Sequence, residues 1–193
     1  MIICTIQFLK KAGIMDPKLL KSIHNMFKAR NYDLNSIKKD KKLKSYNEII
    51  NKDSQRNEKL IFIFIKTSKA NNTSSTIRDV CTLSLIKNIN HIIIVSNKPF
   101  DTHIKKYVDL FHNNTRIELF NQLFFQNNFI QRSNIKYSLL NDEEVCNMIK
   151  TMGKKIEIIK STDPMVRYFD YKKNSILRIF NSIYQSYSFR IVK

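Results

Sequence analysis

The sequence predicts two parts: an N-terminal α/β domain with a small parallel or mixed sheet, and a small C-terminal α+β domain that ends in a β-hairpin. Two short, continuously apolar runs, 60–65 and 91–96, are typical of strands buried on both faces. Helical patterns precede and separate them, with apolar residues repeating every three or four positions. The final residues, 186–193, alternate with the period of a half-buried strand.

An amphipathic helix is predicted to begin at Asp16-Pro17 and to end near Arg30. Proline suits the first helical position, where a backbone N–H would have no partner within the helix. The apolar residues lie on one helix face: Leu19, Leu20, Ile23, Met26 and Phe27. After a turn at 31–33, Asp33 can cap a second, more basic helix that we expect to reach Ile50.

Strands and helices then alternate up to residue 120. Strands are predicted at 60–65, 91–96 and 116–120, with one helix after each of the first two. The buried faces of these helices are expected to be Ile77, Val80, Cys81 and Leu85 in the first, and Ile104, Tyr107, Val108 and Phe111 in the second. This order predicts a parallel or mixed sheet with right-handed crossovers.

A further helix is predicted from Asn141, where acidic residues fill the first turn and Glu144 completes a capping box. Its expected buried face is Val145, Met148, Ile149 and Met152. The segment 161–180 then begins with a cap at Thr162 or Asp163 before a short helical turn at 165–169. A polar turn at 170–174, a strand at 176–180 and a loop at 181–185 lead into the closing strand.

This segment resembles the C-terminal assembly domain of the fifth-largest subunit shared by the nuclear RNA polymerases, a family that also has archaeal members. The family pattern is roughly T/G-D-P-V/I-A-R-Y-F/Y-G-x-K/R-R-G-Q-V-V-K-I. Matching positions hold Thr162, Asp163, Pro164, Arg167, Tyr168, Phe169, Lys172, Lys173, Ile176 and Ile179. Asp170 and Asn174 replace family glycines, and Arg178 replaces a usual lysine. Asp and Asn tolerate the left-handed conformation better than other non-glycine residues, so both turns can form.

The resemblance implies a non-catalytic subunit of a multisubunit DNA-directed RNA polymerase. Residues 125–193 would form an assembly domain that docks on the largest subunit, alongside other core subunits. Residues 15–124 resemble the jaw domain that eukaryotic members carry near downstream duplex DNA, with non-specific contacts to phosphates. Residues 1–14 are expected to be an extension, with either Met1 or Met15 as the start. Such a protein is intracellular: nuclear if cellular, and in the host cytoplasm or the virion if it comes from a large cytoplasmic DNA virus.

The resemblance also implies a set of partner-binding residues: Asp163, Pro164, Arg167, Tyr168, Phe169, Lys172, Lys173 and Arg178. Arginines can offer forked donors to carboxylates or carbonyls, and aromatic rings can anchor apolar contacts. Two alternatives stay open at this point. Tyr168 and Phe169 can instead pack against their own hairpin, and Asp163 can simply cap its own turn.

The chain is strongly basic, with 34 Lys and Arg against 16 Asp and Glu and a net charge of +18. Such a surplus attracts nucleic-acid backbones, although an AT-rich genome also favours lysine codons. The densest run is Lys38, Lys39, Lys41, Lys42 and Lys44, which is either a solvated helix face or a surface that faces DNA or a partner. A free-standing basic nucleic-acid-binding protein is therefore the alternative function.

Other function classes lack their signatures. The three cysteines are far apart and the four histidines show no metal-ligand spacing, so neither a disulfide scaffold nor a metal site is expected. A metal-dependent nuclease needs an E-x-K pair, but Leu119-Phe120 follow Glu118 and Ile158-Ile159-Lys160 follow Glu157. No phosphate loop, nucleophile elbow or membrane-length apolar run occurs. We therefore expect no catalytic residues, no cofactor, no small-molecule ligand and no membrane partner.

Overall fold

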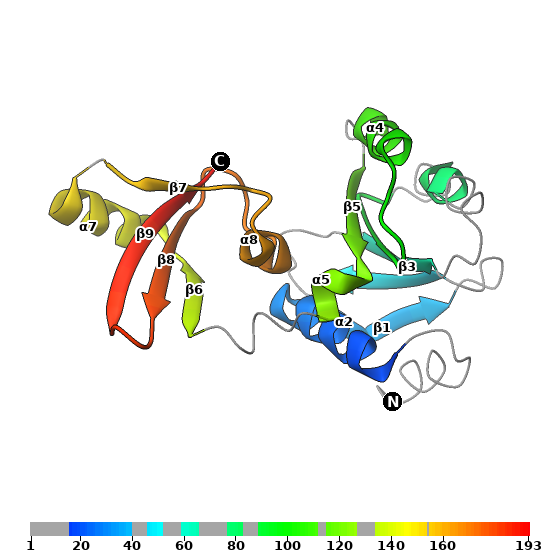
Figure 1. Cartoon of the computed structure of the whole chain (residues 1–193), viewed down its shortest axis with the longest axis horizontal. Coiled ribbons are helices and arrows are strands. Elements are labelled where there is room, and N and C mark those ends of the chain that lie inside the picture. The colour runs from blue at the N-terminus through cyan, green and yellow to red at the C-terminus, as the bar shows by residue number, and fades with distance from the viewer. Residues whose placement is uncertain are drawn as a thin grey trace. The chain divides into compact units, whose positions relative to one another are not determined.

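The computed structural model describes residues 16–39, 46–51, 59–65, 77–82, 89–111, 115–126, 134–153 and 155–193 (Figure 1). It divides into two compact units, an N-terminal unit, Met1–Asn127, and a C-terminal unit, Asn128–Lys193. Each unit has its own β-sheet. The predicted extension, residues 1–14, lies outside the described residues.

The N-terminal unit is built on a five-stranded sheet with the order β1-β2-β3-β4-β5. The strands are β1 (Tyr32–Lys39), β2 (Tyr46–Asn51), β3 (Lys59–Ile65), β4 (His91–Ser96) and β5 (Arg116–Asn121). The first three strands pair antiparallel, and β3, β4 and β5 pair parallel. The prediction of a parallel or mixed sheet is thus confirmed as a mixed sheet.

The predicted helices pack on this sheet through apolar faces whose described residues are buried or half-buried, whereas the short helix at 122–126 was not predicted. The helices are α2 (Pro17–Ala29), a helical stretch at 77–82, α4 (Thr102–Phe111) and the short α5 (Gln122–Gln126). All five predicted apolar residues of α2 are buried, and Asp16 caps this helix by accepting from the N–H of Lys18 at 3.0 Å. Every residue of β4 is buried, as expected for a central parallel strand. Leu85 lies outside the described residues.

The second basic helix predicted from Asp33 to Ile50 is wrong, because this segment contributes the strands β1 and β2. Asn31 has a left-handed backbone (φ 63°) that ends α2 and turns the chain directly into β1. Asp33 is therefore paired with Ile50 in the ladder rather than capping a helix. Helix propensity is a weak prior, and pairing with β3 supplies backbone hydrogen bonds that override it.

The C-terminal unit has a four-stranded sheet with the order β6-β8-β9-β7. Its strands are β6 (Ile135–Leu139), β7 (Glu157–Ile159), β8 (Ile176–Asn181) and β9 (Ser186–Val192), and its helices are α7 (Asp142–Met152) and α8 (Pro164–Phe169). The predicted closing hairpin is confirmed, because β8 and β9 pair antiparallel with continuous register. The pattern did not predict β6 or the very short β7.

The two faces of this sheet carry different helices, because successive strand residues point to opposite sides. On the α8 face, Leu177 and Ile179 of β8 pack with Val166 of α8, together with Ile159 and Val192. On the α7 face, the alternate residue Arg178 reaches Glu144 of α7. The predicted capping box of α7 is confirmed, since Asn141 and Glu144 each accept from the other's backbone N–H.

Candidate partner interface

The predicted partner-binding segment begins at a well-formed helix cap. The Oδ1 atom of Asp163 accepts from the backbone N–H groups of Met165 at 2.8 Å and Val166 at 3.3 Å. Pro164 stands at the first helical position, where its missing N–H costs nothing. Of the two capping candidates, Asp163 is therefore the residue that caps α8, and Pro164 lies exposed beside it.

The turns on either side of Tyr171 use the left-handed conformation expected where glycines were replaced. Asp170 has φ 59° and Asn174 has φ 67°. Asp170 ends α8 as its C-cap, and Asn174 N–H donates to the carbonyl of Val192 at 2.8 Å. Both turns thus survive with Asp and Asn, the non-glycine residues that adopt this conformation most readily.

Backbone hydrogen bonds fix the whole segment to the end of β9. Ser161 N–H donates to the Lys193 carbonyl at 2.7 Å, and Val192 N–H donates to the Ser175 carbonyl at 3.0 Å. Both ends of the segment are therefore tied to the last residues of the chain. Such anchoring at two points presents the side chains between them in a fixed arrangement, which lowers the entropic cost of binding a partner.

The aromatic side chains of the segment divide between the core and the surface. Tyr168 is 7% exposed, and its ring meets that of Phe169 edge-on with centroids 5.1 Å apart. Phe169 is half-buried and stacks on Tyr171 at 5.5 Å. The hydroxyl of Tyr171 donates to the Tyr137 carbonyl at 3.3 Å, and burial raises the pKa of Tyr171 to about 12. Packing within its own unit therefore accounts for Tyr168, whereas Phe169 retains exposed surface.

The predicted basic residues do not share one surface. Lys172 and Lys173 are exposed on the turn after α8, and Lys172 Nζ lies 2.9 Å from Asp170 Oδ2. Arg167 is half-buried on α8. Arg178 instead lies on the α7 face, with its Nη2 2.6 Å from Glu144 Oε1. The structure thus groups residues 163–173 and separates Arg178 from them.

Glu144 serves both the cap of α7 and this ion pair. The hydrogen bond from the Asn141 backbone N–H lowers the pKa of Glu144, and the hydrogen bond from Arg178 lowers it further. Arg178 therefore links β8 to α7 within the unit. Its replacement of the family's lysine keeps the charge and adds a planar fork of donors.

The basic run predicted to face nucleic acid falls in and after β1. Lys38 and Lys39 are the last residues of β1, at the outer edge of the sheet, with Lys38 opposite Glu48 of β2 in the ladder. Lys41, Lys42 and Lys44 lie outside the described residues. Lysines are common on edge strands because their charge discourages pairing with other chains.

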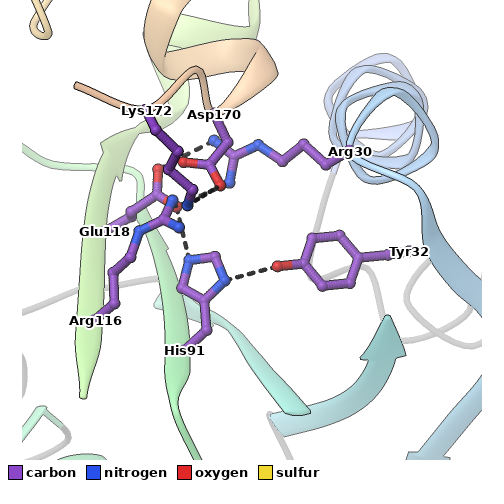
Figure 2. Close-up of polar contacts among 7 residues, drawn as sticks. All are labelled: Arg30, Tyr32, His91, Arg116, Glu118, Asp170 and Lys172. Carbon is purple, nitrogen blue, oxygen red and sulfur yellow. Dashed lines mark hydrogen bonds and ion pairs between the residues drawn. The ribbon is translucent and has the colours of Figure 1, made fainter. Parts of the chain in front are cut away.

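Sequence reasoning missed a buried cluster of charges in the N-terminal unit. Figure 2 shows Arg30, His91 and Arg116 converging on Glu118. Arg30 is bidentate, with Nη1 2.8 Å from Oε1 and Nη2 3.0 Å from Oε2, and Arg116 Nη2 lies 2.7 Å from Oε1. The Arg30 side chain is 2% exposed and that of Glu118 is 14% exposed. The one available signal was a glutamate within the otherwise apolar strand pattern at 116–120.

His91 extends the cluster to Tyr32. His91 Nε2 lies 2.7 Å from Glu118 Oε1, and Nδ1 lies 2.7 Å from the Tyr32 hydroxyl. A carboxylate can only accept, so Nε2 carries the proton and Nδ1 accepts from Tyr32 in the neutral ring. Burial lowers the pKa of His91, with Glu118 opposing. Burial would raise the pKa of Glu118, but the charge of Arg30 and hydrogen bonds from His91 and Arg30 hold it well below its usual value.

This cluster joins α2, β1, β4 and β5 and does not resemble a nuclease centre. The carboxylate oxygens of Glu118 already accept from arginine and histidine donors, which a divalent metal would have to displace. No group of three or more His, Cys, Asp or Glu side chains with metal-site spacing occurs among the described residues. Within the same residues, no helix is long and apolar enough to cross a membrane.

The C-terminal unit is thus a small α+β domain that presents a capped, doubly anchored basic-aromatic segment, an arrangement suited to binding another protein. Residues 132–192 match the family model described as RNA polymerase Rpb5, C-terminal domain. The chain therefore carries the C-terminal domain of the Rpb5 family, as its sequence motif predicted, and this domain indicates a subunit of an RNA polymerase. A search of curated proteins finds no match.

Proposed function

We propose that this chain is a non-catalytic subunit of a multisubunit DNA-directed RNA polymerase that docks on the largest subunit through its C-terminal unit. The observation that carries the proposal is the family match over 132–192, which contains the anchored segment 161–175. Within that segment, Pro164, Lys172 and Lys173 are exposed, and Phe169 and Arg167 are half-buried, so all five keep some solvent-exposed surface. As a polymerase subunit, the protein would act inside the cell: in the nucleus if it is cellular, and in the host cytoplasm or the virion if it comes from a large cytoplasmic DNA virus.

The N-terminal unit is proposed to act as a jaw-like domain near downstream DNA. Its mixed α/β sheet and the excess of basic residues at 10–60, with 14 Lys and Arg against 6 Asp and Glu, support this role. Contacts of this kind would be made to phosphates and would carry no sequence information. The protein would have no catalytic activity of its own.

The alternative is a free-standing basic nucleic-acid-binding protein, which the net charge of +18 favours. The two functions differ in which binding partner stays bound at high salt. Affinity for DNA alone falls steeply as salt rises, because binding releases counterions. A protein that is bound through a packed protein interface keeps its partner under the same conditions.

The deciding experiment is affinity purification of the tagged chain from its natural setting, with mass spectrometry of the proteins that remain at high salt. Stoichiometric recovery of the two largest polymerase subunits is the expected result. Recovery of the chain alone, or of nucleic acid that salt removes, would contradict the proposal and favour the free-standing binder.

A further inference from the structure

The α8 face of the C-terminal sheet carries a groove to which the family motif assigns no role. Its volume is about 340 Å³, and one wall is apolar, with Ile135, Tyr137 and Ile179 on neighbouring strands β6 and β8. This volume lies at the low end of the range of about 300–1,000 Å³ for ligand sites. The groove therefore suits a short segment rather than a whole domain.

The other wall carries hydrogen-bonding side chains at a regular spacing along β9. Ser186, Ser188 and Arg190 alternate along the strand and all line the groove. Alternate residues of a strand lie about 6.8 Å apart, which is also the repeat of any extended peptide laid alongside. Both serines are exposed, so their hydroxyls can donate or accept.

Arg190 supplies a buried donor that lacks an acceptor. Its Nη2 lies 2.8 Å from Glu157 Oε2, whereas its Nε is buried and has no hydrogen-bond partner among the described residues. A buried polar group without a partner costs about 1–3 kcal/mol, so the Nε of Arg190 calls for an acceptor outside the described residues. The acceptor that fits is a carbonyl oxygen, because Glu157 already compensates the charge of Arg190.

The groove is continuous with the proposed docking segment. Asp163, the cap of α8, forms part of its lining. Tyr137 lines the same groove, and the charge of Asp163 adds to burial in raising the pKa of Tyr137. Asp163 therefore belongs both to the groove and to the proposed docking segment.

We propose that this groove binds an extended, uncharged segment of the largest polymerase subunit, which offers a backbone carbonyl to Arg190 Nε and inserts an aliphatic side chain between Ile135, Tyr137 and Ile179. This inference rests on the proposed docking function and adds its site and the chemistry of the occupant. It also assigns a role to Ser188 and Arg190, which the family motif at 162–179 does not include.

The test uses the full-length tagged chain purified from its natural setting at high salt. Ser188→Phe fills the groove, and aromatic residues are well tolerated in strands. The matched control is Ser138→Phe, which makes the same change at an exposed position of β6 on the α7 face. We expect Ser188→Phe to reduce recovery of the largest subunit by about tenfold, and Ser138→Phe to leave it unchanged. If both variants melt at the same temperature as the unaltered chain, their folding is intact.

Arg190→Lys tests the hydrogen bond itself, since lysine keeps the positive charge near Glu157 but removes Nε. We expect about fivefold lower recovery, the equivalent of one hydrogen bond. A photo-crosslinking residue at position 188 should then attach to one extended segment of the largest subunit. Crosslinks that form only within this chain would overturn the inference.

The outcomes separate this inference from the function on which it rests. If the unaltered chain recovers the large polymerase subunits and Ser188→Phe recovers them equally well, the groove assignment is wrong and the polymerase function stands. If the unaltered chain recovers neither of the two large subunits, both proposals are wrong.

Discussion

The two units of this protein use charge in opposite ways. The N-terminal unit buries Glu118 with Arg30 and His91, whose side chains are only 2% and 1% exposed. In the C-terminal unit, the ion pairs Lys172–Asp170, Arg178–Glu144 and Arg190–Glu157 each have at least one partner that is more than a third exposed. Buried charges are costly to leave without compensation, whereas exposed pairs contribute little.

Different interactions therefore hold the two units together. In the N-terminal unit, one carboxylate holds together residues that are distant in the chain. The C-terminal unit instead fixes the segment 161–175 by local caps and backbone hydrogen bonds to Val192 and Lys193. We therefore expect stability to respond to different changes in each unit.

The largest expected effect is that of Glu118→Gln, which keeps the shape of the side chain but removes its charge. We expect the N-terminal unit to lose about 3 kcal/mol of unfolding free energy, because the buried side chains of Arg30 and His91 lose their carboxylate partner. Urea denaturation followed by hydrogen exchange of peptides from each unit measures this loss. The control is Glu157→Gln, whose side chain is 72% exposed beside Arg190 and whose loss should cost at most about 1 kcal/mol. Equal losses for the two variants would remove the contrast between the units.

The next largest expected effect is that mild acid lowers the stability of the N-terminal unit but not that of the C-terminal unit. Burial lowers the pKa of His91 below its usual 6.5, so the unfolded chain takes up this proton more readily than the folded chain. The N-terminal unit should therefore lose stability as the pH falls below about 6.5, and His24 acts in the same direction. Glu118 has a lowered pKa, so its contribution is complete above its usual 4.5 and is lost only as the pH falls through its lower folded value. All four histidines lie outside the C-terminal unit, which should be unaffected between pH 7 and 5.

Hydrogen exchange of each unit at pH 7 and pH 5.5, corrected for intrinsic rates, measures this difference. His91→Gln, which keeps an N–H donor for Glu118, should flatten the response of the N-terminal unit, and His24→Gln should flatten it less. Equal acid sensitivity of the two units would show that the buried histidine does not control stability in this range.

A smaller effect is expected from Asp163→Ala, which removes the cap of α8. Loss of a helix cap typically costs about 1 kcal/mol, and the effect should be confined to the C-terminal unit. Faster hydrogen exchange at the amides of Met165 and Val166, which now donate to Asp163, is the measurement. Asp163→Asn is the matched control, since its side-chain oxygen can still accept these bonds. If the Asn variant exchanges as fast as the Ala variant, the carboxylate charge matters more than the cap.

The features predicted correctly from the sequence are mostly local. The apolar face of α2, the buried strand β4, the capping box at Asn141 and the turns at Asp170 and Asn174 depend on residues close together in the chain. The failures depend on long-range pairing. A helix was predicted in place of β1 and β2 because the pairing of β1 with β2, and of β2 with β3, leaves no local signal. Three-residue β7 is too short to show a period. The Glu118 cluster pairs Arg30 with Glu118, which are 88 positions apart in the sequence, so no local motif could predict it.

In the candidate site too, the local features were predicted and those that depend on long-range pairing were not. The motif at 162–179 identified the capped segment and its family, because these residues form one continuous structure. It also grouped Arg178 with them, although strand alternation sends Arg178 to the α7 face. The groove was not foreseen, since it combines residues of β6, β8 and β9 that come together only when the sheet forms.

An effect of about the same size tests whether local conformation alone sets the turn at Asn174. Its φ of 67° favours Gly or Asn, so Asn174→Ala should cost about 1 kcal/mol while Asn174→Gly changes stability little. Asn147→Ala makes the same chemical change in the exposed face of α7, where alanine is the better helix former, and should stabilise slightly. Chemical denaturation of the three variants measures these signs. Opposite signs for one substitution at two exposed sites would show that backbone geometry, rather than the side chain itself, decides the effect at position 174. If Asn174→Ala is neutral, the side-chain contact with Lys193 and the left-handed turn are both dispensable.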